Sequence, residues 1–99
     1  MTYHLDNNAD MTGTHLVCVL SGVNSEQVRR VFGEHSPASY DDYEAGYDGQ
    51  EWHFVSPNGL FNLYSRYGNL RVGAWDDEDV ADFLAWLGGK LGVDLLRSV

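Results

Sequence analysis

The chain has 99 residues, which is the size of a single domain. Its residues are 43% hydrophobic and 13% aromatic, and this composition predicts a folded chain rather than a disordered acidic one. Fifteen acidic residues against six lysines and arginines give a formal net charge of −9, which argues against binding nucleic-acid phosphates or anionic membranes. The natural partner of such a chain is a basic protein surface.

Cysteine usage and the first residues indicate a cytoplasmic protein. Cys18 is the only cysteine, so no intrachain disulfide can form. The opening MTYHLDNNADM lacks the basic and apolar regions of a signal peptide. The longest apolar run, 16–20, is too short to span a bilayer.

The first half of the chain predicts an arm, a strand and a helix. Residues 1–13 are polar and rich in turn formers, typical of a loose arm. The β-branched run 15–20 predicts a central strand in which Cys18 is a small buried residue. Residues 24–32 predict a helix, because Asn24 and Gln27 have the spacing of a capping box.

Three strands follow, joined by short turns. The runs 51–55 and 60–67 flank Ser56-Pro57-Asn58-Gly59, which suits a type I turn, and 70–75 predicts the next antiparallel strand. In the first run, alternation places Trp52 and Phe54 on a buried face. It therefore places Glu51 and His53 together on the solvent side.

Residues 76–87 predict an amphipathic helix. Asp76 or Asp77 is the expected cap. The second acidic cluster, Asp76, Asp77, Glu78, Asp79 and Asp82, is then explained mainly by capping and solvation. Gly88-Gly89 is expected to break or end this helix. Residues 91–99 fit either a last turn or a short terminal strand.

These elements predict an α+β fold, with an antiparallel sheet of about four strands in β-α-β-β-β-α order and two helices on one face. The domain would span 1–99, with a loose arm (1–13), a folded core (14–87) and a C-terminal extension (88–99). The expected core consists of Val17, Val19, Val28, Val31, Phe32, Trp52, Phe54, Phe61, Leu63, Val72, Phe83, Leu84 and Leu87.

No motif predicts catalysis, a cofactor or a metal, so an enzyme is not expected. The four histidines are scattered, without the HxH, HxxxH or CxxC spacing of zinc sites. A calcium loop starting at Asp42 would place Tyr47 at the required glycine and His53 at the closing glutamate. His53 beside Glu51 or Asp48 is the acid–base pair to consider.

The acidic-tyrosine segment, residues 40–51, is the leading candidate for a partner contact. Its carboxylates suit lysines and arginines on a basic protein, and its tyrosines add contact area at low entropic cost. The same composition also suits a solvated edge that resists aggregation. The predicted contact residues are Tyr40, Asp41, Asp42, Tyr43, Glu44, Tyr47, Asp48 and Glu51.

The alternative function is a binder of a small, nucleotide-like ligand. Tyr64 and Tyr67 offer stacking surfaces, and Arg66 and Arg71 offer guanidinium groups for phosphate. Such a site would line a pocket at the interface of a homo-oligomer. The arginines could equally pair with carboxylates on neighbouring strands.

Between about residues 15 and 87 the chain resembles a group of small phage and mobile-element accessory proteins. The residues that carry the resemblance are Phe32-Gly33, Trp52-His53-Phe54, Asn58-Gly59, Leu63-Tyr64 and Arg71-Val72-Gly73-Ala74. The chain departs from the group in the last motif, where a Trp-x-x-Gly-Gly-like segment is expected. The resemblance implies an accessory protein, and small acidic proteins of this kind are often inhibitors of host enzymes or defence systems.

Overall fold

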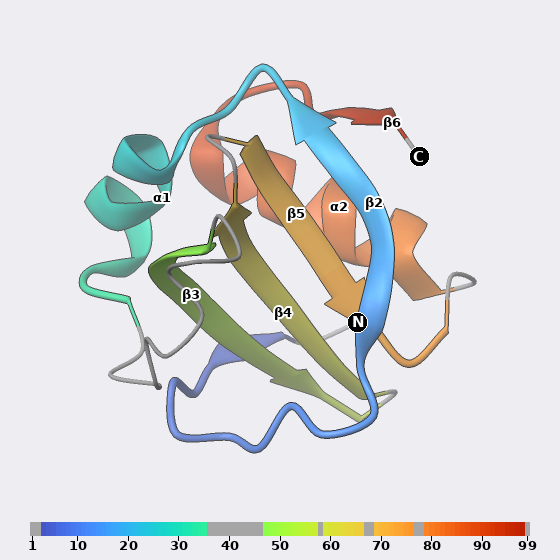
Figure 1. Cartoon of the computed structure of the whole chain (residues 1–99). Helices are drawn as coiled ribbons and strands as arrows, with labels where there is room; N and C mark the ends of the chain where they lie inside the picture. The colour runs from blue at the N-terminus through green and yellow to red at the C-terminus, as the bar shows by residue number, and fades with distance from the viewer. Residues whose placement is uncertain (1–2, 36–46, 58, 67–68, 77–78, 99) are drawn as a thin grey trace.

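The computed structural model describes residues 3–35, 47–57, 59–66, 69–76 and 79–98, without the side chains of 47–49, 66 and 96–98. The elements are β1 (His4–Leu5), β2 (His15–Ser21), α1 (Ser25–Phe32), β3 (Tyr47–Ser56), β4 (Gly59–Arg66), β5 (Asn69–Ala74), α2 (Val80–Leu91) and β6 (Leu96–Ser98). The strands form one antiparallel sheet in the order β1-β3-β4-β5-β2-β6 (Figure 1).

Both helices pack on one face of this sheet. Phe54 of β3 contacts Phe32 of α1 and Phe83 of α2, with ring centroids 5.0 and 5.4 Å apart. A side chain on one face of a strand can reach both helices only if they cover that same face. The predicted α+β fold is confirmed. Strands β2 to β5 are the long ones, and β1 and β6 add two and three residues at the edges.

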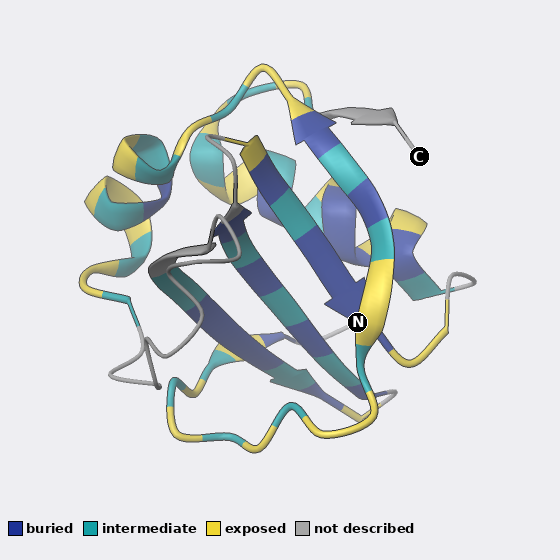
Figure 2. Cartoon of the chain, in the orientation of Figure 1, coloured by how far each residue is buried: buried dark blue, intermediate teal, exposed yellow. Residues whose placement is uncertain are grey.

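The hairpins align the buried face from strand to strand. Trp52 of β3 lies opposite Leu63 of β4, which lies opposite Val72 of β5, and all three are fully buried. Figure 2 shows buried and partly buried residues alternating along β4, whereas β3 and β5 each contain three consecutive buried residues, 52–54 and 72–74. The predicted residues Val28, Trp52, Phe54, Phe61, Leu63, Val72, Phe83, Leu84 and Leu87 are buried, and Tyr3, Cys18, Leu20, Leu70, Ala74 and Val80 join them.

Helix α1 begins with the predicted capping box. The Gln27 backbone N–H donates to the Asn24 side chain at 3.0 Å, and the Asn24 N–H donates to the Gln27 side chain at 2.8 Å. The prediction that Val31 belongs to the core is wrong, because 45% of it is exposed. Val28 and Phe32, one helical turn apart, meet the sheet and turn Val31 away from it.

In strand β2 the predicted burial of Cys18 is confirmed, whereas Val17 and Val19, which were predicted for the core, are not among its buried residues. Cys18 and Leu20 are buried, whereas Val19 lies opposite Arg71 on the other face. The cause is a register shift between Leu16 and Cys18, which resembles a β-bulge and resets which residues point inward. Val17, at the shift, is only partly buried against the core.

Helix α2 begins later and ends later than predicted. It runs through Gly88-Gly89 to Leu91 and ends at Gly92, which has left-handed φ and ψ of 71° and 28°. A Cβ at residue 88 would lie 2.9 Å from the carbonyl oxygen of Val93, so the close approach of the returning chain requires glycine there. The prediction that the glycine pair breaks the helix is therefore wrong.

The termini are more integrated than predicted. Tyr3, in the predicted loose arm, is 6% exposed, and its ring meets Phe61 and Phe83 at 5.5 and 5.4 Å. Its hydroxyl donates to Asp82 of α2 at 2.5 Å. At the other end, β6 pairs with β2. The folded core therefore extends beyond the predicted 14–87.

The Tyr3 contact predicts a loss of stability in alkali. Burial and then the Asp82 hydrogen bond raise the pKa of Tyr3 above its ordinary value of 10.0. Above about pH 10 an unfolded tyrosine loses its proton while the folded chain retains it, so the free energy of unfolding must fall as the pH rises.

Urea unfolding between about pH 9 and 11 measures this slope. Tyr3→Phe should reduce the decline of the free energy of unfolding with pH. Tyr64→Phe, a matched change on the other face of the sheet, should leave this decline unchanged. An equally steep decline in Tyr3→Phe would show that other groups cause it.

Candidate functional site

The predicted partner-contact residues fall mostly outside the described part of the chain. Residues 40–44 are not described, and only the backbone of Tyr47 and Asp48 is placed, at the start of β3. The Glu51 side chain is described. Its carboxylate Oε1 lies 2.8 Å from Nε2 of His53.

His53 fastens the N-terminal segment to the helix-free face of the sheet. Its ring Nδ1 lies 3.0 Å from the carbonyl oxygen of Ala9, and its backbone N–H donates to the Asn7 side chain at 3.1 Å. An oxygen acceptor thus faces each ring nitrogen, so the imidazolium form donates to both oxygens and a neutral ring to one. Residues 7–9 are thereby held against β3.

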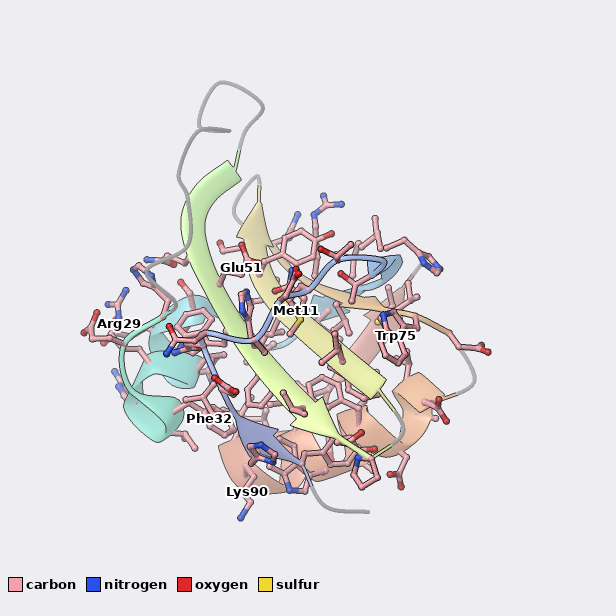
Figure 3. The ribbon with its side chains drawn as sticks, turned by 90° about the horizontal axis from the view of Figure 1, so that it is seen from below. Met11, Arg29, Phe32, Glu51, Trp75 and Lys90 are labelled. Carbon is pink, nitrogen blue, oxygen red and sulfur yellow. The ribbon has the colours of Figure 1, made fainter. Side chains whose placement is uncertain are left out.

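The expectation of a solvent-side His53 is wrong. Glu51 and His53 do share a face, as alternation predicts, yet His53 is only 5% exposed. The reason is that residues 6–14 pass across β3 and β4 on their way to β2, as Figure 3 shows around Met11. With both ring nitrogens engaged and the ring covered, the geometry gives this pair a fastening role.

Part of the predicted ligand site is brought together. Tyr64 of β4 lies opposite Arg71 of β5 on the helix-free face. On the strand at the other edge of β4, Glu51 of β3 also lies opposite Tyr64. The Arg66 side chain and Tyr67 lie outside the described residues. An open groove of about 610 Å³ occurs elsewhere, where α2 faces the segment 92–95.

The structure reveals an exposed corner that the sequence analysis did not single out. Trp75, directly after β5, is 53% exposed. A Cβ at Gly59 would lie 2.9 Å from Trp75 Cε3, so the indole ring packs closely on that glycine. The indole N–H points to the Thr12 carbonyl oxygen, 3.5 Å away. Figure 3 shows Trp75 beside the crossing segment.

Two exposed acidic residues are linked to Trp75. Asp76 follows it in the chain, and Asp10 is joined to it through Thr12. The Thr12 backbone N–H and hydroxyl donate to Asp10 Oδ1 at 3.0 and 2.5 Å. These hydrogen bonds lower the pKa of the Asp10 carboxyl, so it is ionised at neutral pH. Asp10, Trp75 and Asp76 are called the Trp75 corner below.

Capping hydrogen bonds do not account for the described residues of the second acidic cluster, and Asp77 and Glu78 lie outside the described residues. The N-cap of α2 is Asp79, rather than the predicted Asp76 or Asp77, and its side chain makes no capping hydrogen bond. Asp82, in the first turn, does complement the positive helix end. The start of α2 thus leaves Asp76 in the connection between β5 and the helix.

Comparisons of the chain with protein-family models, curated proteins and solved structures give no match. Among the described residues, no group of three or more His, Cys, Asp or Glu side chains is arranged to hold a metal ion. Within the same residues, no helix has the length and apolar character needed to cross a membrane. Cys18 is 1% exposed in the core, as predicted.

Removing the His53 ring should loosen the N-terminal segment. His53→Ala leaves the Glu51 carboxylate and the Ala9 carbonyl without this partner, at an expected cost of about 2 kcal/mol. Hydrogen exchange at the amides of residues 7–12 should accelerate more than exchange in the β4–β5 hairpin.

His15→Ala, at an exposed position where β2 begins, is the matched control and should stay within about 0.5 kcal/mol of the unmodified protein. Unchanged exchange of residues 7–12 in His53→Ala would show that other contacts hold the segment.

Proposed function

We propose that this protein is an acidic protein-binding module that covers a basic surface on its partner. The observation that carries the proposal is an excess of exposed carboxylate. The ion pairs within the described residues involve Glu26 and Glu51. Other carboxylates are exposed and outside these pairs, namely Asp6, Asp10, Glu34, Asp82 and Asp94. A surface of one charge sign favours encounter with the opposite sign.

The structure describes four cationic side chains, those of Arg29, Arg30, Arg71 and Lys90, and they do not offset this charge. Arg29 and Arg30 of α1 both lie near Glu26, at 3.2 and 3.9 Å. Lys90 of α2 stands 5.9 Å from the centre of the Trp86 ring. The surface is therefore suited to lysines and arginines supplied from outside, because desolvated charge pairs across an interface set register and suppress wrong partners.

The acidic-tyrosine segment is the proposed main contact. Its carboxylates, Asp41, Asp42, Glu44, Asp48 and Glu51, would steer association, and Tyr40, Tyr43 and Tyr47 would supply contact area. Truncation of an aromatic anchor at the centre of an interface costs about 2 kcal/mol or more. Glu51 also holds His53, which links this segment to the crossing residues 7–9.

The partner class follows from the charge. Proteins that handle nucleic acids present basic clefts for phosphate, and a row of carboxylates imitates phosphate charge. The resemblance to phage and mobile-element accessory proteins would make this chain an inhibitor of such a host or defence enzyme. The inhibitor role rests on this analogy and is tested by identifying the partner protein.

A pull-down from host lysate at low and high salt tests the module. The test variant replaces Asp41, Asp42, Glu44 and Asp48 by Asn or Gln. The control replaces Asp6, Glu34, Asp79 and Asp94 in the same way, so both variants lose the same charge. A salt-sensitive partner should be lost with the test variant and retained with the control.

Equal retention by both variants would contradict a contact through the acidic-tyrosine segment. The absence of any salt-sensitive partner would contradict the module itself.

The second candidate is the ligand binder, favoured by the placement of Tyr64 opposite Arg71 on the helix-free face. A nucleotide at a hundredfold excess over its Kd should raise the free energy of unfolding by ~2.7 kcal/mol. Thermal-shift measurements with mono- and dinucleotides detect this, and the gain should disappear in Arg71→Ala. No shift with any nucleotide would remove this candidate.

A further inference from the structure

Trp75 is exposed in a way that packing alone does not require. Among the residues whose side chains the structure describes, the exposed large apolar ones are Leu16 at 47%, Val31 at 45% and Trp75 at 53%. The chain buries Trp52 completely, with its indole N–H donating to the Gly33 carbonyl at 3.0 Å. A half-exposed tryptophan is a common anchor of protein interfaces, because it offers a large surface with few rotatable bonds.

The exposed indole is also held in place. Gly59 has a φ of 144° and admits the ring at a distance that any Cβ would block. Gly13, with a φ of 90°, brings its backbone to the indole edge, where a Cβ would lie 3.4 Å from Nε1. An anchor that is already ordered loses little conformational entropy on binding.

The charges beside the ring select the kind of partner. Asp10 is fixed by Thr12, the same residue whose carbonyl faces the indole N–H, so carboxylate and ring are positioned by one turn. Asp76, the residue that follows Trp75 in the chain, is a second exposed acidic residue. An exposed indole that is linked to one acidic residue through Thr12 and followed in the chain by another suits a side chain that is cationic and flat.

We propose that the Trp75 corner is a recognition site for an arginine side chain of the partner protein, whose guanidinium stacks on the indole while Asp10 and Asp76 accept its hydrogen bonds. Arginine fits better than lysine, because its planar group both stacks and donates several hydrogen bonds. This inference rests on the proposed function and gives it an anchor distinct from the acidic-tyrosine segment.

The test uses the full chain and two probes, octa-arginine and octa-lysine peptides of equal charge, at about 10 mM salt, where screening is weak. The indole N–H resonances of the tryptophans are followed by NMR. The Trp75 resonance should shift on titration and that of buried Trp52 should not. The arginine peptide should bind more tightly than the lysine peptide.

Trp75→Ala separates the ring from the charge, because the net charge stays at −9. This variant should weaken octa-arginine binding about fivefold and abolish the preference over octa-lysine. Trp75→Phe should retain part of the preference. Val31→Ala, at the comparably exposed residue of α1, is the matched control and should change neither value.

The outcomes separate this inference from the function beneath it. If octa-arginine binds while Trp75→Ala keeps the full preference, the arginine site is overturned, and the acidic-tyrosine segment is still judged by its own pull-down. If neither peptide binds, both proposals fall. If the chain self-associates and Trp75→Ala abolishes this, a second copy occupies the corner, which also overturns the arginine site.

Discussion

A cluster of aromatic rings is the contact on which the rest of the structure depends. Phe61 of β4 and Phe83 of α2 stack with centroids 4.6 Å apart and an interplanar angle of 10°, which joins the sheet to its main helix. Phe54 contacts Phe83 and Trp86 of α2 as well as Phe32 of α1. Because a small domain buries little surface, concentrating large rings between its two layers is an efficient source of stability.

The same cluster determines where the N-terminal segment lies. Tyr3 enters the cluster from the start of the chain, and β1 then pairs with the outer edge of β3. From there residues 6–14 cross the helix-free face to reach β2, held at His53 and meeting Trp75 through Thr12. The segment thus touches both faces of the sheet. The position of Trp75 depends on that crossing, so the exposed corner is coupled to the core.

In the two proposals, binding depends on long-range attraction by carboxylates and on an aromatic side chain that anchors the complex. Long-range attraction from the carboxylates raises the rate of encounter and weakens with salt, whereas an ordered ring that excludes water lengthens the lifetime of the complex. The acidic-tyrosine segment and the Trp75 corner differ in this respect. The first is dominated by charge, and the second places one immobilised indole among fewer carboxylates.

The sequence by itself determined the local structure of this protein. The capping box of Asn24 and Gln27, the β3–β4–β5 hairpins and the shared face of Glu51 and His53 follow from short-range geometry and alternation, which need no knowledge of distant residues. Segments in which one residue periodicity holds from end to end were therefore predictable, and so was the α+β fold that these segments form.

Only the tertiary structure decided which faces are covered. Cys18 and Leu20, rather than Val17 and Val19, became the buried residues of β2 after the register shift. The crossing segment buried His53, and α2 continues through Gly88, where the Val93 carbonyl approaches too closely for any Cβ. Trp75 likewise became a candidate site through Gly13 and Gly59, which lie far from it in sequence. Each outcome depends on contacts between segments distant in the chain, and the local pattern of residues does not encode those contacts.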